Sequence, residues 1–192
     1  KLNSSSALLI RQLQVFNAIQ RPAEGEKRLV AWLAAHPQDV SIRAVLAENL
    51  IKRKQYKAAT EHYLILNEST PNHLLVLNNL AWALFESKDN RALGFAEQAL
   101  KLKPDNPAAM DTLGWILIHQ GQTERGFKLL QQALSRQPDA TEIQYHLAVA
   151  FLKNGDNIRA RRELERLLAS GMTFPQEQEA GMLLKRLHSK VR

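Results

Sequence analysis

Four prolines recur along this chain at nearly constant spacing. Pro37, Pro71, Pro104 and Pro138 stand 34, 33 and 34 residues apart. Proline cannot extend an α-helix, because it lacks the backbone N–H and its ring clashes with the preceding turn. Each of these residues is therefore expected to end a helix. Helix ends at this regular interval predict a series of similar short units rather than one sheet-based domain.

The segments between the prolines repeat a pattern of apolar and small residues. Asn78–Pro104 and Asp111–Pro138 both carry Leu, a small residue and Trp near the start of a first helix. A second small residue follows in a second helix, beyond a turn. The small residues of the four registered segments are Ala47, Ala81, Gly114 and Ala148 in the first helices, and Ala59, Ala92, Gly126 and Ala160 in the second.

Small residues at these positions let the axes of two paired helices approach where they cross. Gly114 is the smallest of the first-helix set. A large side chain there should overpack the crossing and cost about 1–3 kcal/mol. Turns between paired helices are expected near Lys54, Lys88, Gly121 and Gly155.

A helix–turn–helix unit with this period resembles the tetratricopeptide repeat (TPR) family. The resemblance implies an all-α, right-handed α-solenoid, in which each hairpin packs only on its neighbours. We expect a divergent helical hairpin first, then four repeats, then a C-terminal capping helix. The corresponding ranges are 1–37 for the hairpin, 40–71, 74–104, 107–138 and 141–172 for the repeats within 38–172, and 173–192 for the cap.

Composition excludes several classes of protein. The chain has 192 residues, 45% of them hydrophobic, and no cysteine, so it has neither a disulfide framework nor a thiolate metal site. No apolar run approaches the roughly 20 residues of a membrane-spanning helix. The net charge of +7 is spread along the chain, with glutamates between the arginines. We interpret it as solvated helix faces rather than a nucleic-acid surface.

Catalytic and metal-binding motifs are absent from the sequence. The six histidines form no i, i+4 pair and no His-Glu-x-x-His run. The chain also lacks a Gly-rich phosphate-binding loop and a Gly-x-Ser-x-Gly turn. We therefore predict a protein that is not an enzyme, with no cofactor and no metal.

The TPR resemblance implies that partners bind in the concave groove lined by the first helices. The family's groove positions hold polar and aromatic residues here, which we take as the candidate partner-binding set. They are Asn78, Asn79, Trp82, Asp111, Trp115, His119, Tyr145 and His146.

Two interpretations of the aromatic residues remain open. Trp82, Trp115 and Tyr145 could form a ladder of flat faces along the groove, or the tryptophans could pack between hairpins as core. The two asparagines favour binding, because an amide gains little from a core. The carboxylate clamp of chaperone-binding TPR domains is missing, since Ala44 and Glu48 occupy its first positions.

A narrower resemblance covers about half of the chain, from Asn78 to Gly171. The blocks NNLAW, DTLGWIL and YHLAVA are similar to the C-terminal end of the PEP-CTERM-system TPR-repeat lipoproteins. The resemblance implies a lipid-anchored periplasmic protein of Gram-negative bacteria, associated with the outer membrane. It also implies a role in exopolysaccharide production and in sorting of surface proteins by exosortase. Because the chain begins with Lys1, we expect it to be part of a longer protein.

Three functional hypotheses follow from these patterns. The first is an interaction scaffold that binds a protein or peptide segment in its groove and does not itself span a membrane. The second is a polysaccharide-binding module that uses the aromatic ladder. The third is a self-assembly module that docks through its N-terminal hairpin.

Overall fold

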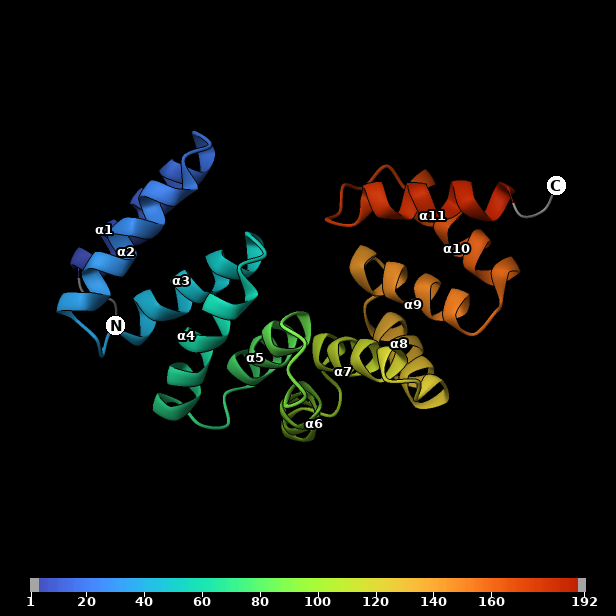
Figure 1. Ribbon diagram of the computed structural model, residues 1–192, viewed down its shortest axis with the longest axis horizontal. Coiled ribbons are helices and arrows are strands. Elements are labelled where there is room, and N and C mark those ends of the chain that lie inside the picture. The colour runs from blue at the N-terminus through green and yellow to red at the C-terminus, as the bar shows by residue number, and fades with distance from the viewer. Residues whose placement is uncertain (1–3, 190–192) are drawn as a thin grey trace. The chain divides into compact units, whose positions relative to one another are not determined.

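The computed structural model describes residues 4–189, and these residues form eleven α-helices and no strand. By contacts the chain divides into two compact units, residues 1–99 and 100–192. Each unit is a succession of helical hairpins (Figure 1). The helices are α1 Ser4–Ala18, α2 Pro22–Ala35, α3 Val40–Lys52, α4 Tyr56–Ser69, α5 Leu74–Glu86, α6 Ala92–Leu102, α7 Pro107–His119, α8 Thr123–Arg136, α9 Thr141–Lys153, α10 Asn157–Ala169 and α11 Glu177–Ser189.

The four spaced prolines end helices as predicted. Pro37, Pro71, Pro104 and Pro138 each lie two residues beyond the last residue of α2, α4, α6 and α8. The first helices of the hairpins begin soon afterwards, and two of them have side-chain caps. The Asp39 carboxylate accepts the Ile42 N–H at 3.0 Å, and the Asn106 side chain accepts the Ala109 N–H at 2.9 Å. Such caps stabilise the exposed amides of a first helical turn.

The turns within the hairpins share one backbone geometry. Gln20, Lys54, Lys88, Gly121 and Gly155 all have a positive φ, between 57° and 81°. The N–H of the next residue returns to the carbonyl five residues before it, at 2.7–3.0 Å, which is the helix-ending arrangement of a Schellman motif. The turn predicted at each of the last four positions is therefore present. Glycine occupies it twice, and a residue with a Cβ occupies it three times.

We expect Lys88→Gly to raise the free energy of unfolding by about 0.5–1 kcal/mol. A left-handed residue with a Cβ costs about 1–2 kcal/mol, and the added freedom of glycine in the unfolded chain offsets part of that gain. Urea denaturation measures the change. Lys88→Ala is the matched control, because it removes the same side chain but keeps the Cβ at φ 62°. Equal stability of the two variants would contradict the explanation.

The small residues lie where the helices of each hairpin cross, as the pattern predicted. The six alanines of the set are at most 2% exposed. At the α7–α8 crossing, a Cβ added to Gly114 would lie 3.0 Å from the Gly126 carbonyl oxygen and 3.0 Å from Leu130 Cγ. The crossing therefore has no room for an ordinary side chain.

In the N-terminal hairpin a different pair of residues allows the two helices to approach where they cross. A Cβ on Gly25 in α2 would lie 2.7 Å from Leu13 Cδ1 in α1. Leu13 is large where the first helices of the other hairpins carry Ala or Gly, and Gly25 compensates for it in the second helix. In this divergent hairpin the large and the small residue have therefore exchanged places across the crossing.

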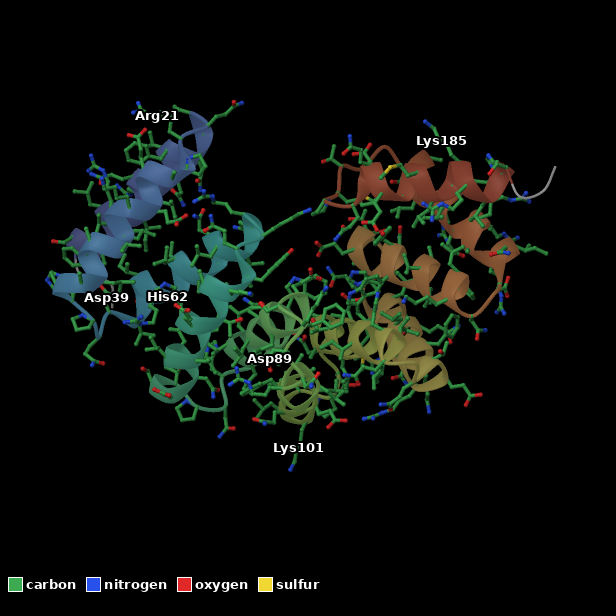
Figure 2. All side chains as sticks on the ribbon, viewed as in Figure 1. Arg21, Asp39, His62, Asp89, Lys101 and Lys185 are labelled. Carbon is green, nitrogen blue, oxygen red and sulfur yellow. The ribbon has the colours of Figure 1, made fainter. Side chains whose placement is uncertain are left out.

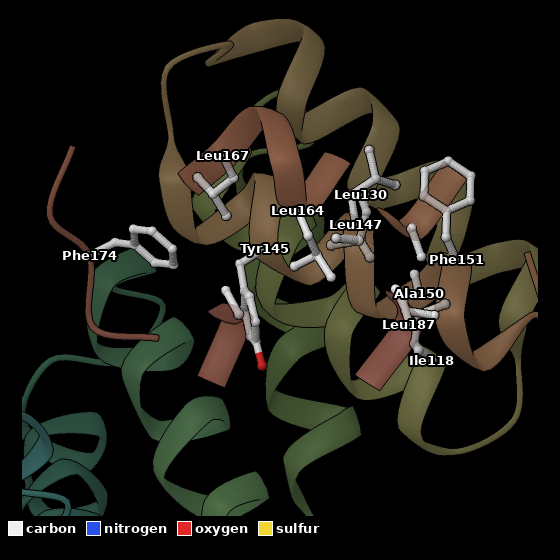
Figure 3. Packing of buried hydrophobic residues seen from close by; sticks show 13 residues of the cluster. Ile118, Leu130, Tyr145, Leu147, Ala150, Phe151, Leu164, Leu167, Phe174 and Leu187 are labelled. Carbon is white, nitrogen blue, oxygen red and sulfur yellow. The ribbon is translucent and has the colours of Figure 1, made fainter. Parts of the chain in front are cut away.

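A large apolar cluster fills the space between α9, α10 and α11 in the second unit. Tyr145, Leu147 and Phe151 of α9 pack with Leu164 and Leu167 of α10, and all are at most 6% exposed (Figure 3). Phe174, in the loop before α11, and Leu187 of α11 join the same cluster. The final helix is therefore held by burial of apolar side chains. The last three residues of the range predicted for the cap lie outside the described residues.

Candidate partner-binding site

The predicted binding residues fall into the two units. Asn78, Asn79 and Trp82 lie on α5 in the first unit. In the second unit, five of the set lie on two helices that pack together, α7 and α9. These five residues are Asp111, Trp115 and His119 of α7 and Tyr145 and His146 of α9.

A buried polar pair connects α7 to α9. Nδ1 of His146 lies 2.8 Å from one carboxylate oxygen of Asp111 and 3.0 Å from the other. The exposed fraction is 3% for His146 and 9% for Asp111. Buried polar groups need such partners, because an unpaired one loses its water without compensation. Both residues lie beneath the surface, where they hold the two first helices together.

Trp115 packs directly on this pair. Its ring stacks on the His146 ring with 4.1 Å between centroids and an interplanar angle of 26°. The His119 ring covers another part of it, at 4.2 Å, and its Nδ1 lies 3.0 Å from the Trp115 carbonyl oxygen. Burial and the positive charge of Lys153 lower the pKa of His119 from its ordinary value of 6.5. Trp115 is only partly exposed: its ring packs on a residue of the next repeat, and the residue also lines a pocket.

Tyr145 connects the groove to the last helix. The side chain is 2% exposed, and its hydroxyl points away from Leu164 in the core (Figure 3). Burial, with a hydrogen bond to the Glu179 carboxylate of α11, raises the pKa of the Tyr145 hydroxyl far above 10.0. The Tyr145 hydroxyl therefore stays protonated over the whole neutral range.

Helix α11 carries residues in the repeat register of α9. Glu179, Leu183 and Arg186 of α11 lie 34 residues after Tyr145, Val149 and Leu152 of α9. All six of these residues line one pocket. The final helix thus occupies the place of one more first helix and extends the same face.

This pocket, hereafter the α11 pocket, has a volume of about 340 Å³. Volumes of 300–1,000 Å³ are typical of sites for small molecules and side chains. It is lined by Trp115 of α7, Tyr145, Val149, Leu152 and Lys153 of α9, Asn157 of α10, and Glu179, Leu183, Arg186 and Leu187 of α11.

The lining of the α11 pocket combines apolar surface with charge. Its two cations, Lys153 and Arg186, are exposed and form no ion pair within residues 4–189. The single carboxylate of the lining is Glu179 of α11, which helps to raise the pKa of the Tyr145 hydroxyl. The indole N–H of Trp115 is buried and has no hydrogen-bond partner in the described part of the chain. Glu179 and Arg186 were not among the residues predicted from the sequence, because the last helix was expected only to cap the repeats.

The candidate residues of the first unit have a different setting. Asn79 Nδ2 donates to the Tyr63 hydroxyl of α4 at 3.0 Å, so this amide supports a buried tyrosine. The side-chain oxygen of Asn78 is buried without a hydrogen-bond partner among residues 4–189. Trp82 is partly exposed and lies 6.2 Å from the Phe85 ring. Asn79 therefore contributes to packing, which the argument from its amide alone did not anticipate.

We expect the tyrosines to titrate late in the folded protein. Burial raises the pKa of Tyr63 from 10.0 to about 12, with Asn79 opposing the shift. A raised folded-state pKa stabilises the protein fully below pH 10, and this contribution is lost as the pH rises towards about 12. Tyrosinate absorbance should therefore rise at a higher pH in the native protein than in urea.

Tyr63→Phe is the control for the assignment of this titration. It should remove part of the late phase and reduce the loss of stability above pH 10, because a phenyl ring has no proton to lose. If native and urea-unfolded protein titrate together, the burial of Tyr63 is not as the structure describes it.

No three His, Asp or Glu side chains within residues 4–189 are grouped so that they could hold a metal ion. No helix in the same range is both long and apolar enough to cross a membrane.

Comparisons with known proteins find similarity to tetratricopeptide repeat proteins. Residues 117–187 match the family model described as tetratricopeptide repeat. The TPR repeat-containing protein PA4667 of Pseudomonas aeruginosa is 32% identical over 120 residues, which is 60% of this chain and 20% of that protein. This chain thus spans about a fifth of the length of that relative.

Solved structures share the fold over most of the chain. A thermophilic TPR protein of Thermus thermophilus gives a TM-score of 0.76 at 20% identity, over 95% of this chain and 98% of that one. The TPR protein YrrB, described as having an unusual peptide-binding site, gives 0.62 at 14% identity, over 96% and 91%. Likeness at such identities shows the fold alone. The predicted all-α TPR solenoid is confirmed.

Proposed function

We propose that this TPR chain is a non-catalytic scaffold that binds a segment of a partner protein on the face formed by its first helices. The observation that carries the proposal is the α11 pocket, which lies on that face and is lined by first helices and by α11. Stacked helical repeats typically present such a face to extended partners. The solved TPR protein YrrB, described as a peptide-binding protein, supports this class of partner.

The eight predicted residues have different roles in this proposal. Trp115 lines the pocket, and His119 lies beside it at the exposed surface. Asp111 and His146 hold Trp115 from below, and Tyr145 lines the pocket together with Glu179. In the first unit, Asn78, Asn79 and Trp82 belong to a second stretch of partner-binding surface on α5.

The wider setting that we propose is a bacterial envelope system for exopolysaccharide production and protein sorting of the PEP-CTERM type. The support is the similarity of residues 78–171 to the TPR lipoproteins of that system. We therefore propose a periplasmic location, associated with the outer membrane through a lipid anchor elsewhere in a longer protein.

Direct binding of a polysaccharide is the alternative function. Sugar recognition by aromatic rings uses open, flat faces. Here the Tyr145 side chain is 2% exposed, and one face of Trp115 is stacked on His146. The remaining lining of the pocket is aliphatic and charged, which supports a peptide rather than a sugar chain.

Retention of proteins from a Gram-negative envelope extract tests the proposed function. The wild-type chain should retain specific proteins, and Val149→Glu should lose them, because it places a charge on the apolar wall of the pocket. Ile158→Glu is the matched control, since Ile158 of α10 is 77% exposed and does not line the pocket.

Thermal unfolding should first establish that both variants are folded. Retention of the same proteins by Val149→Glu would contradict the proposed site. Retention of carbohydrate without protein would favour the polysaccharide alternative.

A further inference from the structure

We propose that the α11 pocket selects acidic peptide segments that carry one large apolar side chain. This inference rests on the proposed scaffold function and narrows it to one chemistry of partner. It assigns selectivity to α11, which adds Glu179, Leu183, Arg186 and Leu187 to the surface formed by α7 and α9.

The volume and the apolar walls of the pocket favour binding of an apolar side chain. A volume of about 340 Å³ accommodates a leucine or phenylalanine side chain with its adjoining backbone, but not a folded domain. Val149, Leu152 and Leu183 are partly buried in the core cluster and form the aliphatic wall, with Trp115 at one side. Burial of a leucine side chain on such a wall contributes much of the affinity of a short peptide.

The charges of the pocket favour acidic residues on either side of the apolar residue of the bound peptide. Lys153 and Arg186 are exposed and have no ion-pair partner within residues 4–189. Glu179 is the only carboxylate of the lining, so it balances one of the two cations and leaves the other without a counter-charge. A carboxylate on either side of the apolar residue would therefore meet an uncompensated cation.

One polar side chain of the pocket lining is available to the backbone of the peptide. Asn157 offers an amide to the same peptide from α10.

Two cations do not make a nucleic-acid surface. Affinity for a phosphate backbone grows with the number of phosphates that are neutralised, and it needs a row of cations with little apolar wall between them. The α11 pocket has two cations, one carboxylate and mostly apolar walls. A short acidic and apolar segment matches this arrangement better.

Fluorescence anisotropy with three labelled pentapeptides tests the inference. All three are acetylated and amidated: Asp-Asp-Leu-Asp-Asp, the same peptide with Gly in place of Leu, and Lys-Lys-Leu-Lys-Lys. We expect the first to bind about tenfold more tightly than the other two, since it alone offers both the apolar side chain and the carboxylates. The preference over the Lys peptide should decrease at high salt.

Charge reversal of single residues on α11 tests whether the peptide binds in the α11 pocket. Arg186→Glu should weaken binding of the acidic Leu peptide about tenfold, because it replaces an attraction by a repulsion. Lys185→Glu is the matched control: it is the same charge change at the adjacent exposed residue, which does not line the pocket. In Figure 2 the Lys185 side chain projects from α11 on the side away from α9.

Several outcomes would overturn the inference. They are equal binding of the three peptides, an equal effect of Arg186→Glu and Lys185→Glu, and binding that requires a free C-terminal carboxylate in place of the amide. If these peptides fail while Val149→Glu still loses its partner proteins from extracts, the scaffold function stands and the acidic selectivity is wrong.

Discussion

Asp111→Ala is expected to lower the free energy of unfolding by about 3 kcal/mol. The change removes both oxygen contacts of the His146 ring, at 2.8 and 3.0 Å, and leaves a ring that is 3% exposed without its acceptor. Removing one member of a buried polar pair costs this much because the remaining member stays desolvated. Urea denaturation followed by Trp fluorescence measures the loss, and Trp115 should report it directly, since its ring stacks on His146.

Two controls distinguish this pair from an ordinary surface contact. Asp105→Ala removes an ion pair with Arg136 whose aspartate side chain is 85% exposed, and it should change stability by less than about 0.5 kcal/mol. The double variant Asp111→Ala/His146→Phe keeps a ring against Trp115 but leaves no unpaired imidazole. Its cost should fall short of the sum of the single costs by at least about 1 kcal/mol. Additive costs would show that the two side chains are not coupled.

Gly126→Ala is expected to destabilise the second unit by about 1–3 kcal/mol. The added Cβ would lie 2.7 Å from the Gly114 carbonyl oxygen and 3.0 Å from the Ile118 backbone nitrogen. Backbone atoms in a helix cannot yield as a flexible side chain can, so α7 and α8 have to separate. Alanine favours the helical state over glycine by up to about 1 kcal/mol, and the overpacking has to exceed that gain.

Gly181→Ala provides the matched control for helix propensity. Gly181 lies inside α11, and a Cβ there would meet no atom within 4 Å. This variant should therefore stabilise the protein by about 0.5–1 kcal/mol. Stability changes of the same sign in the two variants would contradict the close crossing of α7 and α8.

Much of the fold was readable from the sequence because its determinants are local. A proline ends a helix wherever it stands, and a small residue is needed wherever two helices of a hairpin cross. Pro104 and Gly114 show these rules directly, since each depends on a few neighbours along the chain. In the N-terminal hairpin the large Leu13 of α1 is accommodated by Gly25 of α2. The residue pattern of one helix alone therefore did not reveal this crossing.

The candidate site could be predicted only in part. The repeat register placed Trp115 and Tyr145 on the faces of first helices, and the structure places both in the lining of one pocket. The repeat register did not reveal that the Asp111 carboxylate and the His146 ring pair with each other in the interior, because a groove position can be either open or buried. Asn79 shows the same ambiguity, since its amide bonds to the Tyr63 hydroxyl.

By itself, then, the sequence determined the repeat length, the helical hairpins, their crossings and the face on which a partner is expected. Tertiary structure alone decided which polar side chains pair and where that face is hollow. Glu179 and Arg186 join the site only because α11 packs back on α10 in the place of another first helix. The physical reason is that periodicity is set by local backbone geometry, whereas pairing and burial depend on contacts between residues distant in the chain.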